Sequence, residues 1–213
     1  MGAACSIDEL SSIVLAGGAG ARFGGRKLAA RLGGRPLLAH ALDVAAAVGG
    51  NMVVVVGSCP EAARLASDWA NERRCAVRIV AAADQTEGMA ASLRAGLEAL
   101  DPAAKGAFVF LGDMPFVPPG MIPLLAAALA GGATAAAPTF GGVRGHPVLL
   151  GRGMIDRRTL IIGDKGAGGL LSGEPGLVLV EAGSDGVLFD VDTPADLAAA
   201  GARLSRAPIH PAL

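Results

Sequence analysis

One glycine-rich stretch near the start of the chain, Ile13–Lys27, constrains the fold more than any other. Its first four residues, Ile13–Ala16, are apolar and predict a buried strand. Five glycines follow, with Arg22 and Lys27 among them. Backbone N–H groups in such a loop bind anions, and the two cations bring positive charge to the same place. We therefore expect a phosphate-binding loop at the carboxyl end of a first strand, although a flexible glycine loop with two solvated cations would show the same pattern.

The spacing of these glycines does not fit two well-known phosphate loops. A dinucleotide-binding loop needs G-x-G-x-x-G, but the third place after Gly18 and Gly20 falls on Phe23. A P-loop needs G-x-x-x-x-G-K-[ST], but Leu28 stands where the hydroxyl that binds Mg²⁺ should be. The sequence therefore supports neither a nicotinamide dehydrogenase nor a P-loop NTPase.

Composition narrows the class of protein. With 213 residues, 52% hydrophobic and only 17% charged, the chain is long enough for one domain with a full core and is not expected to be disordered. A net charge of -1 without basic runs argues against nucleic acid as a partner. The charge-poor stretch Met121–Pro138 is interrupted by Pro123 and glycines, so we expect no membrane span. The start of the chain lacks an apolar signal core, and we expect a cytoplasmic protein.

Apolar runs alternate with helical patterns along the first half of the chain. Strands are expected at 13–16, 52–56, 77–81 and 107–111, and helices at 36–48, 60–73 and 89–100. This alternation predicts a parallel sheet with helices on both faces, and it places ligands at the carboxyl ends of the strands.

The pattern changes after Pro118. A helix at 121–130 is expected to precede a strand, a turn and a returning strand at 135–150, then short strands at 177–181 and 187–191. The last helix should open at Thr193, with Pro194 at its first position and Asp196 at its third. No long linker divides the chain. The expected fold is a single α/β domain over residues 1–213, Rossmann-like with three αβα layers, whose mostly parallel sheet gains an antiparallel addition in the C-terminal half.

Carboxylates are expected at the same edge of the sheet as the glycine loop. Asp113 directly follows the strand at 107–111, and Asp190 and Asp192 would face one side of a strand. Carboxylates there suit Mg²⁺ held between the protein and nucleotide phosphates. Taken singly, Asp113 equally fits an ordinary Asp turn, and Asp192 a charge that complements the dipole of the last helix. Together with the cationic loop, they form a coherent set for metal-assisted phosphoryl chemistry.

The same residues carry a resemblance to a known family. The run Leu15-Ala16-Gly17-Gly18, with Arg22, Gly24 and Lys27, resembles the signature L-A-G/A-G-x-x-x-R-x-G-x-x-K of sugar-nucleotide and cofactor nucleotidyltransferases. The segments GDMP at 112–115 and DVDTPADL at 190–197 are similar to the two metal-binding segments of the molybdenum cofactor nucleotidyltransferases. The resemblance covers roughly residues 13–197.

This resemblance implies a nucleotidyltransferase fold and assigns roles to residues. Leu15, Ala16, Gly17 and Gly18 would bind the nucleotide. Arg22 and Lys27 would contact its phosphates as catalytic residues, and Asp113 and Asp192 would hold Mg²⁺, with Asp190 a weaker candidate. The nucleotide-binding half would be about residues 10–117 and the acceptor-binding half about 118–204.

Two segments disagree about the nucleotide. The run from Gly88 to Leu93 resembles the G-M-x-x-S-L segment of the cytidylyl branch, which implies that Gly88 and Ser92 contact the nucleotide, with Ser92 near the base. The Ala16-Gly17-Gly18 loop is closer to the guanylyl form. We give more weight to the first segment because it agrees with DVDTP. The resemblance then implies transfer of CMP from CTP to molybdopterin cofactor with release of pyrophosphate; the alternative is a GTP-using guanylyltransferase, or a relative with another acceptor.

The acceptor side carries two further motifs. Gly145-His146-Pro147 matches the G-H-P segment of these enzymes, which makes His146 a candidate acceptor-binding residue, although a His beside a Pro also fits a simple turn. The run 163–167 resembles their G-D-x-G-A motif. A molybdenum hydroxylase would be a recipient of the product. Two alternative functions belong to other classes. A chain with this fold could be an oxidoreductase that acts on a heterocycle, or a protein that only binds the cofactor and delivers it to a dehydrogenase.

Overall fold

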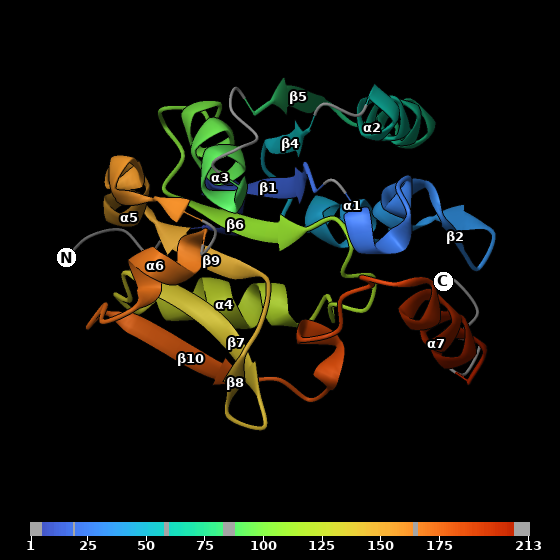
Figure 1. Ribbon diagram of the computed structural model, residues 1–213. Helices are drawn as coiled ribbons and strands as arrows, with labels where there is room; N and C mark the ends of the chain where they lie inside the picture. Colours follow the sequence, from blue (N-terminus) through green and yellow to red (C-terminus); the bar gives the residue numbers. More distant parts are fainter. Residues whose placement is uncertain (1–5, 19, 58–59, 83–87, 164–165, 207–213) are drawn as a thin grey trace.

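A mixed sheet lies at the centre of the molecule, with strand order β10-β7-β9-β6-β1-β4-β5 and with β8 paired to β7 (Figure 1). The computed structural model describes residues 6–18, 20–57, 60–82, 88–163 and 166–206, so Asp164 and Lys165 of the G-D-x-G-A-like motif lie outside the described residues. The strands are β1 (Leu10–Ala16), β4 (Met52–Val56), β5 (Val77–Ala81), β6 (Gly106–Leu111), β7 (Ala135–Phe140), β8 (Val143–Arg144), β9 (Val148–Gly151) and β10 (Leu177–Glu181). A separate hairpin pairs β2 (Arg31–Leu32) with β3 (Arg35–Pro36).

Helices connect these strands. The α-helices are α1 (Leu37–Ala46), α2 (Pro60–Arg73), α3 (Gly88–Glu98), α4 (Met121–Ala130), α5 (Arg152–Asp156), α6 (Ala167–Leu171) and α7 (Pro194–Arg206). Short 3₁₀ turns include η3 (Lys27–Ala29) and η6 (Asp185–Val187). Within the described residues, no helix is both long and apolar enough to cross a membrane.

The parallel part of the sheet follows the prediction. Strand β1 pairs in parallel with both β4 and β6, and β4 pairs in parallel with β5. The antiparallel addition is β9, which runs against β6 on one side and β7 on the other. Strand β10 then pairs in parallel with β7. The expected fold class, an α/β fold with a mostly parallel sheet and an antiparallel addition in the second half, is confirmed.

Two hydrophobic cores lie on opposite faces of the sheet. Alternate residues of β1 divide between them: Val14 packs toward α1, α2 and α4, whereas Ile13 packs toward α3, α5 and α6. Figure 1 shows α3 and α4 on opposite sides of the sheet. A sheet buried on both faces explains why its central strands are apolar throughout.

The prediction of a strand at 187–191 is wrong. Residues 185–187 form η6, and residues 188–192 follow as a turn and loop that joins no sheet. The apolar side chains in this segment serve two packing sites: Val187 lies in the core with α4, whereas Phe189 and Val191 pack with the β2–β3 hairpin. The apolar pattern therefore reflects a segment that bridges two clusters.

Helix α3 approaches the sheet closely at Gly96. A Cβ atom at this position would lie 2.7 Å from Cγ2 of Ile13 and 3.0 Å from Cγ2 of Val55. Gly96→Ala is therefore expected to lower the free energy of unfolding by about 1–3 kcal/mol through overpacking. Gly201→Ala is a matched control, since nothing lies within 4 Å of its added Cβ in α7, and it should stabilise by up to about 1 kcal/mol. Equal stability of the two variants in urea unfolding would contradict this packing.

Candidate active site

The carboxyl ends of three neighbouring strands bring the predicted loop and the first acid together. In the sheet register, Leu15 pairs with Leu111 of β6, and Ala16 pairs with Val56 of β4. The amide of Gly112 donates to the carbonyl of Leu15 at 2.9 Å, so β6 leaves the sheet beside the start of the glycine loop. Asp113, the next residue, is thereby presented at the edge where the loop begins.

The second acid reaches the same place from the far end of the sequence. The amide of Val191 donates to the carbonyl of Asp113 at 3.1 Å, while its side chain is fully buried. This contact fixes the 190–192 segment beside Asp113 without a β-ladder. Asp192 therefore lies beside Asp113 although the two residues are 79 positions apart in the sequence.

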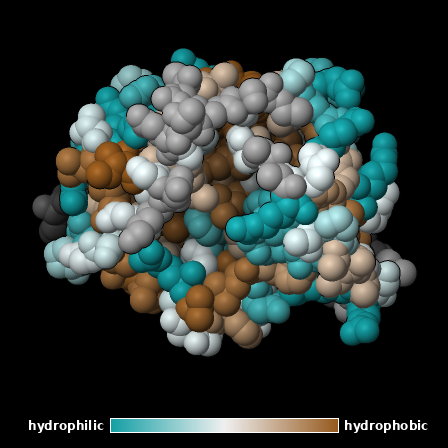
Figure 2. All heavy atoms as spheres, in the orientation of Figure 1, coloured by the Kyte–Doolittle hydropathy of each residue, from teal (hydrophilic) through white to brown (hydrophobic). Residues whose placement is uncertain are grey.

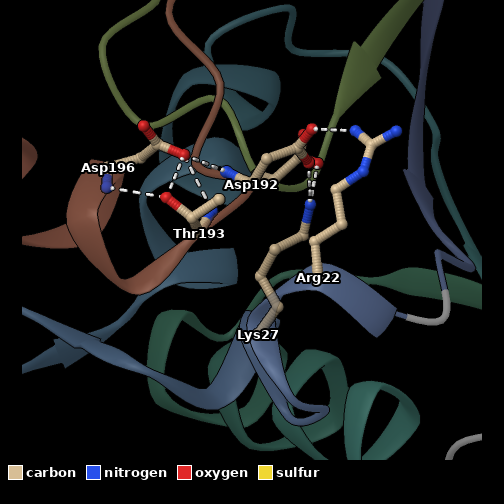
Figure 3. Close-up of polar contacts among 6 residues, drawn as sticks. Arg22, Lys27, Asp192, Thr193 and Asp196 are labelled. Carbon is tan, nitrogen blue, oxygen red and sulfur yellow. Dashed lines mark hydrogen bonds and ion pairs between the residues drawn. The ribbon is translucent and has the colours of Figure 1, made fainter.

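Lys27 joins the two acids. Its Nζ donates to Oδ2 of Asp113 at 2.7 Å and to Oδ1 of Asp192 at 2.9 Å. Only 9% of the Lys27 side chain is exposed, against 81% for Arg22, whose guanidinium lies 3.3 Å from Oδ2 of Asp192 (Figure 3). The structure thus brings together Arg22, Lys27, Asp113 and Asp192, as the sequence predicts.

These contacts shift the pKa values of the groups. Burial alone would lower the pKa of Lys27, but the carboxylates of Asp113 and Asp192 outweigh it, so the pKa lies above its usual value. The hydrogen bond and charge of Lys27 lower the pKa of Asp192. Lys27 is therefore positively charged and Asp192 negatively charged at neutral pH.

The donor set fits a hard divalent cation such as Mg²⁺. Oδ1 of Asp113 is buried and has no hydrogen-bond partner, so this oxygen carries no contact that would compete with a metal ion. Within the described part of the chain, no group of three or more His, Cys, Asp or Glu residues is arranged to hold a metal ion. The pair Asp113 and Asp192 suits Mg²⁺, which proteins commonly bind through one or two carboxylates together with substrate phosphates.

The remaining candidates lie further from this cluster. Asp190 is exposed and, among the described contacts, makes no hydrogen bond to Lys27. Its pKa is raised by burial of the carboxyl and by the charges of Asp192 and Asp113. His146 is half-buried, and its Nδ1 lies 3.4 Å from the carbonyl oxygen of Val109. Burial lowers its pKa, so its ring is neutral at pH 7.

A cavity of about 270 Å³ opens beside the acids. It is lined by Leu15, Gly17, Gly18, Gly88, Met89, Ser92, Leu111 and Asp113. Figure 2 shows a hollow near the middle of this face, with hydrophobic residues visible inside it. Met89, in the first turn of α3, is 40% exposed. The cavity thus contains the nucleotide-binding residues expected from the sequence except Ala16, which is buried in the end of β1.

A larger hollow of about 660 Å³ lies at the amino ends of β1 and β4. Its described lining includes Asp8, Glu9 and Asp101 but neither Lys nor Arg. The carboxylates of Asp8 and Asp101 in this lining repel a polyphosphate, so the smaller cavity is the better candidate for an anionic ligand.

The start of α7 holds Asp192 in place. Oδ2 of Asp196 accepts hydrogen bonds from the amides of Asp192 at 3.1 Å and Thr193 at 2.7 Å, and Oγ1 of Thr193 accepts from the amide of Asp196 at 3.2 Å (Figure 3). This is the reciprocal capping that the sequence predicts.

Removing the cap is expected to affect both stability and metal use. Thr193→Ala should cost about 1 kcal/mol of stability, and it should raise the Mg²⁺ concentration needed for half-maximal turnover, because Asp192 loses its fixed support. Thr193→Ser retains the hydroxyl and is the matched control. Thermal unfolding and Mg²⁺ titration measure the two effects; an unchanged Mg²⁺ requirement in Thr193→Ala would show that the cap does not position Asp192.

Comparison with models of known protein families shows the family to which this chain belongs. The MobA-like NTP transferase domain matches residues 12–177, most of the chain, including the glycine loop and Asp113. The chain belongs to this family. No curated protein sequence matches it significantly.

Solved structures of MobA-like and related proteins share the fold. The Mycobacterium tuberculosis Rv0371c homologue from Mycobacterium sp. strain JC1 is 29% identical, with a TM-score of 0.74 over 92% of this chain and 98% of that one. Rv0371c from M. tuberculosis H37Rv in complex with manganese is 24% identical, with a TM-score of 0.71 over 90% and 96%. Molybdopterin-guanine dinucleotide biosynthesis protein A from Archaeoglobus fulgidus is 22% identical, with a TM-score of 0.70 over 92% and 99%.

Membership in the MobA-like NTP transferase family makes nucleotidyl transfer from a nucleoside triphosphate the supported class of reaction. The direct ion pairs of Lys27 with both acids are the feature that sequence reasoning missed. The sequence motifs predict that Lys27 binds phosphate and that Asp113 and Asp192 bind a metal ion. No sequence signal indicates that these three residues contact one another.

Proposed function

We propose that this protein transfers CMP from CTP to the terminal phosphate of molybdopterin cofactor and releases pyrophosphate in an Mg²⁺-dependent reaction. The observation that carries the proposal is the cluster of Lys27, Asp113 and Asp192 at the cavity lined by Gly17, Gly18 and Ser92. Cations and metal-binding carboxylates at the edge of one cavity are what the transfer of a nucleotidyl group requires.

Each part of the cluster has a role in this reaction. Backbone N–H groups of the glycine loop and the side chains of Lys27 and Arg22 bind the triphosphate and orient it for in-line attack. Asp113 and Asp192 would hold Mg²⁺, which neutralises charge on the phosphate oxygens when bound. Lys27 stabilises the negative charge that develops as pyrophosphate leaves. His146, a proposed acceptor-binding residue, lies near the carboxyl end of β6, because β9 runs antiparallel to β6.

The choice of nucleotide rests on the wall of the cavity. A Cβ added to Gly17 would lie 3.0 Å from Oγ of Ser92, so the loop and the start of α3 touch at this point. The two segments that disagree about the nucleotide therefore act on the same ligand. We favour CTP because Ser92 belongs to the cytidylyl-like segment and lines the cavity.

GTP is the second candidate. The Ala16-Gly17-Gly18 loop favours it, and the A. fulgidus structural neighbour is described as a molybdopterin-guanine dinucleotide biosynthesis protein. A relative that acts on another phosphorylated acceptor would use the same cluster.

The test is pyrophosphate release by the purified protein with molybdopterin cofactor, Mg²⁺ and either CTP, GTP or ATP. The proposal expects the highest kcat/KM with CTP and the cytosine dinucleotide form of the cofactor as product. A preference for GTP would replace the first candidate with the second. Absence of turnover with all three nucleotides, by a protein that is folded, would overturn the proposed acceptor.

A further inference from the structure

The ammonium of Lys27 stands between the two carboxylates to which the metal is assigned. It contacts one oxygen of each, Oδ2 of Asp113 at 2.7 Å and Oδ1 of Asp192 at 2.9 Å. The other oxygen of Asp192 lies 3.3 Å from the guanidinium of Arg22. Both oxygens of Asp192 therefore already contact a cation.

A divalent ion and the ammonium cannot share this position. An Mg²⁺ ion bound by these carboxylates needs their oxygen lone pairs at about 2.0–2.1 Å. Oδ1 of Asp113 is open to it, but Nζ contacts the other oxygen of Asp113 and one oxygen of Asp192, so an ion that bridges the two acids meets the ammonium. Two cations in contact with the same pair of oxygens also repel each other strongly, because little water lies between them. Binding of the metal between Asp113 and Asp192 thus requires the ammonium to leave.

The Lys27 side chain is able to leave without a change in the sheet. Lys27 is the first residue of η3, and its ammonium is carried on a flexible four-carbon stem. The glycine loop lies directly against it, since a Cβ added to Gly20 would be 3.2 Å from Cβ of Lys27. An anion bound to the loop would therefore lie within reach of the ammonium and compete with the carboxylates for it.

We propose that Lys27 competes with the divalent ion for the position between Asp113 and Asp192, so that the metal binds there only when a triphosphate draws the ammonium away. This inference rests on the proposed metal and triphosphate site and adds an order of binding. Arrival of the nucleotide releases the carboxylates, and the metal then joins nucleotide and protein. The protein alone would have little affinity for the metal.

The test uses Mn²⁺ alone as the probe, with electron paramagnetic resonance of the free ion as the readout. Without nucleotide, wild type is expected to bind Mn²⁺ weakly, and Lys27→Met about tenfold or more tightly, because the competing charge is gone. If Lys27→Met folds poorly, Lys27→Gln takes its place in the test. This variant retains a hydrogen-bond donor for one carboxylate, and it is also expected to bind Mn²⁺ more tightly than wild type. Arg22→Met is the matched control. It removes an exposed charge next to Asp192 but leaves the Lys27 ammonium between Asp113 and Asp192, so the Mn²⁺ affinity should change less than in Lys27→Met.

A second arm adds CTP to the wild type. Wild type with CTP should then bind more Mn²⁺ than Asp113→Asn with CTP does. The comparison with Asp113→Asn corrects for the Mn²⁺ that CTP itself binds. Equal Mn²⁺ affinity of wild type and Lys27→Met without nucleotide would overturn the inference while leaving nucleotidyl transfer intact. Absence of turnover with every nucleotide would count against the proposed function, but the nucleotide-free comparison of the two proteins would still decide whether Lys27 excludes the metal.

Discussion

Lys27→Ala is expected to lower turnover by about 10²–10³-fold, the usual effect of removing one group that stabilises developing negative charge. The Lys27 side chain is 9% exposed, and its ammonium contacts both carboxylates, Asp113 and Asp192. Arg22 also contacts Asp192, but its side chain is 81% exposed and water screens its charge, so it substitutes poorly for Lys27. The measurement is steady-state pyrophosphate release at saturating nucleotide.

The control for Lys27→Ala is a measurement that shows whether the variant is folded. Circular dichroism should show native secondary structure, because the contacts of Lys27 lie at the edge of the sheet and outside both cores. The same substitution should tighten Mn²⁺ binding without nucleotide while it slows turnover. This opposite pair of changes distinguishes loss of a catalytic group from unfolding. Turnover close to wild type would remove the central role of Lys27.

Asp113→Asn is expected to lower turnover by about 10³-fold, since a bound metal contributes several kcal/mol to stabilising charge in the transition state. The change retains the size of the side chain and removes only its charge. Oδ1 of Asp113 is buried without a partner, so an ion in the site has a ligand there that Asn replaces poorly. Turnover should be measured across a range of Mg²⁺ concentrations, because a weakened site is partly rescued by excess metal.

Asp190→Asn is the matched control for Asp113→Asn. Both residues are acids near the same cluster, but Asp190 is exposed and lies outside the hydrogen bonds of Lys27. Its substitution is expected to have a much smaller effect than that of Asp113. If the two variants lose activity equally, Asp190 is a metal ligand of the same rank, and the assignment of the site must change.

Much of the fold follows from local sequence signals. The bounds of β4, α2, β5, α4 and β10 match the predicted ranges. For β4 and α4, the apolar run ends directly before a glycine, Gly57 or Gly131. The start of α7 follows from Thr193 and Asp196, whose side chains cap the helix as expected. Such features depend on contacts within a few residues, and a single sequence contains them.

The parts that the sequence did not predict depend on contacts between distant segments. The apolar pattern of 187–191 resembles a strand, but its side chains pack into two different clusters. The ion pairs of Lys27 join residues 86 and 165 positions apart. Local propensity carries no information about which partner such a side chain will meet.

The most direct test of the site is a crystal structure of the protein soaked with CTP and Mn²⁺, with the ion located by its anomalous scattering. The account predicts one Mn²⁺ ion bound by Asp113, Asp192 and triphosphate oxygens, with Nζ of Lys27 moved onto a phosphate. A triphosphate bound away from the glycine loop, or an ion that touches neither acid, would contradict it.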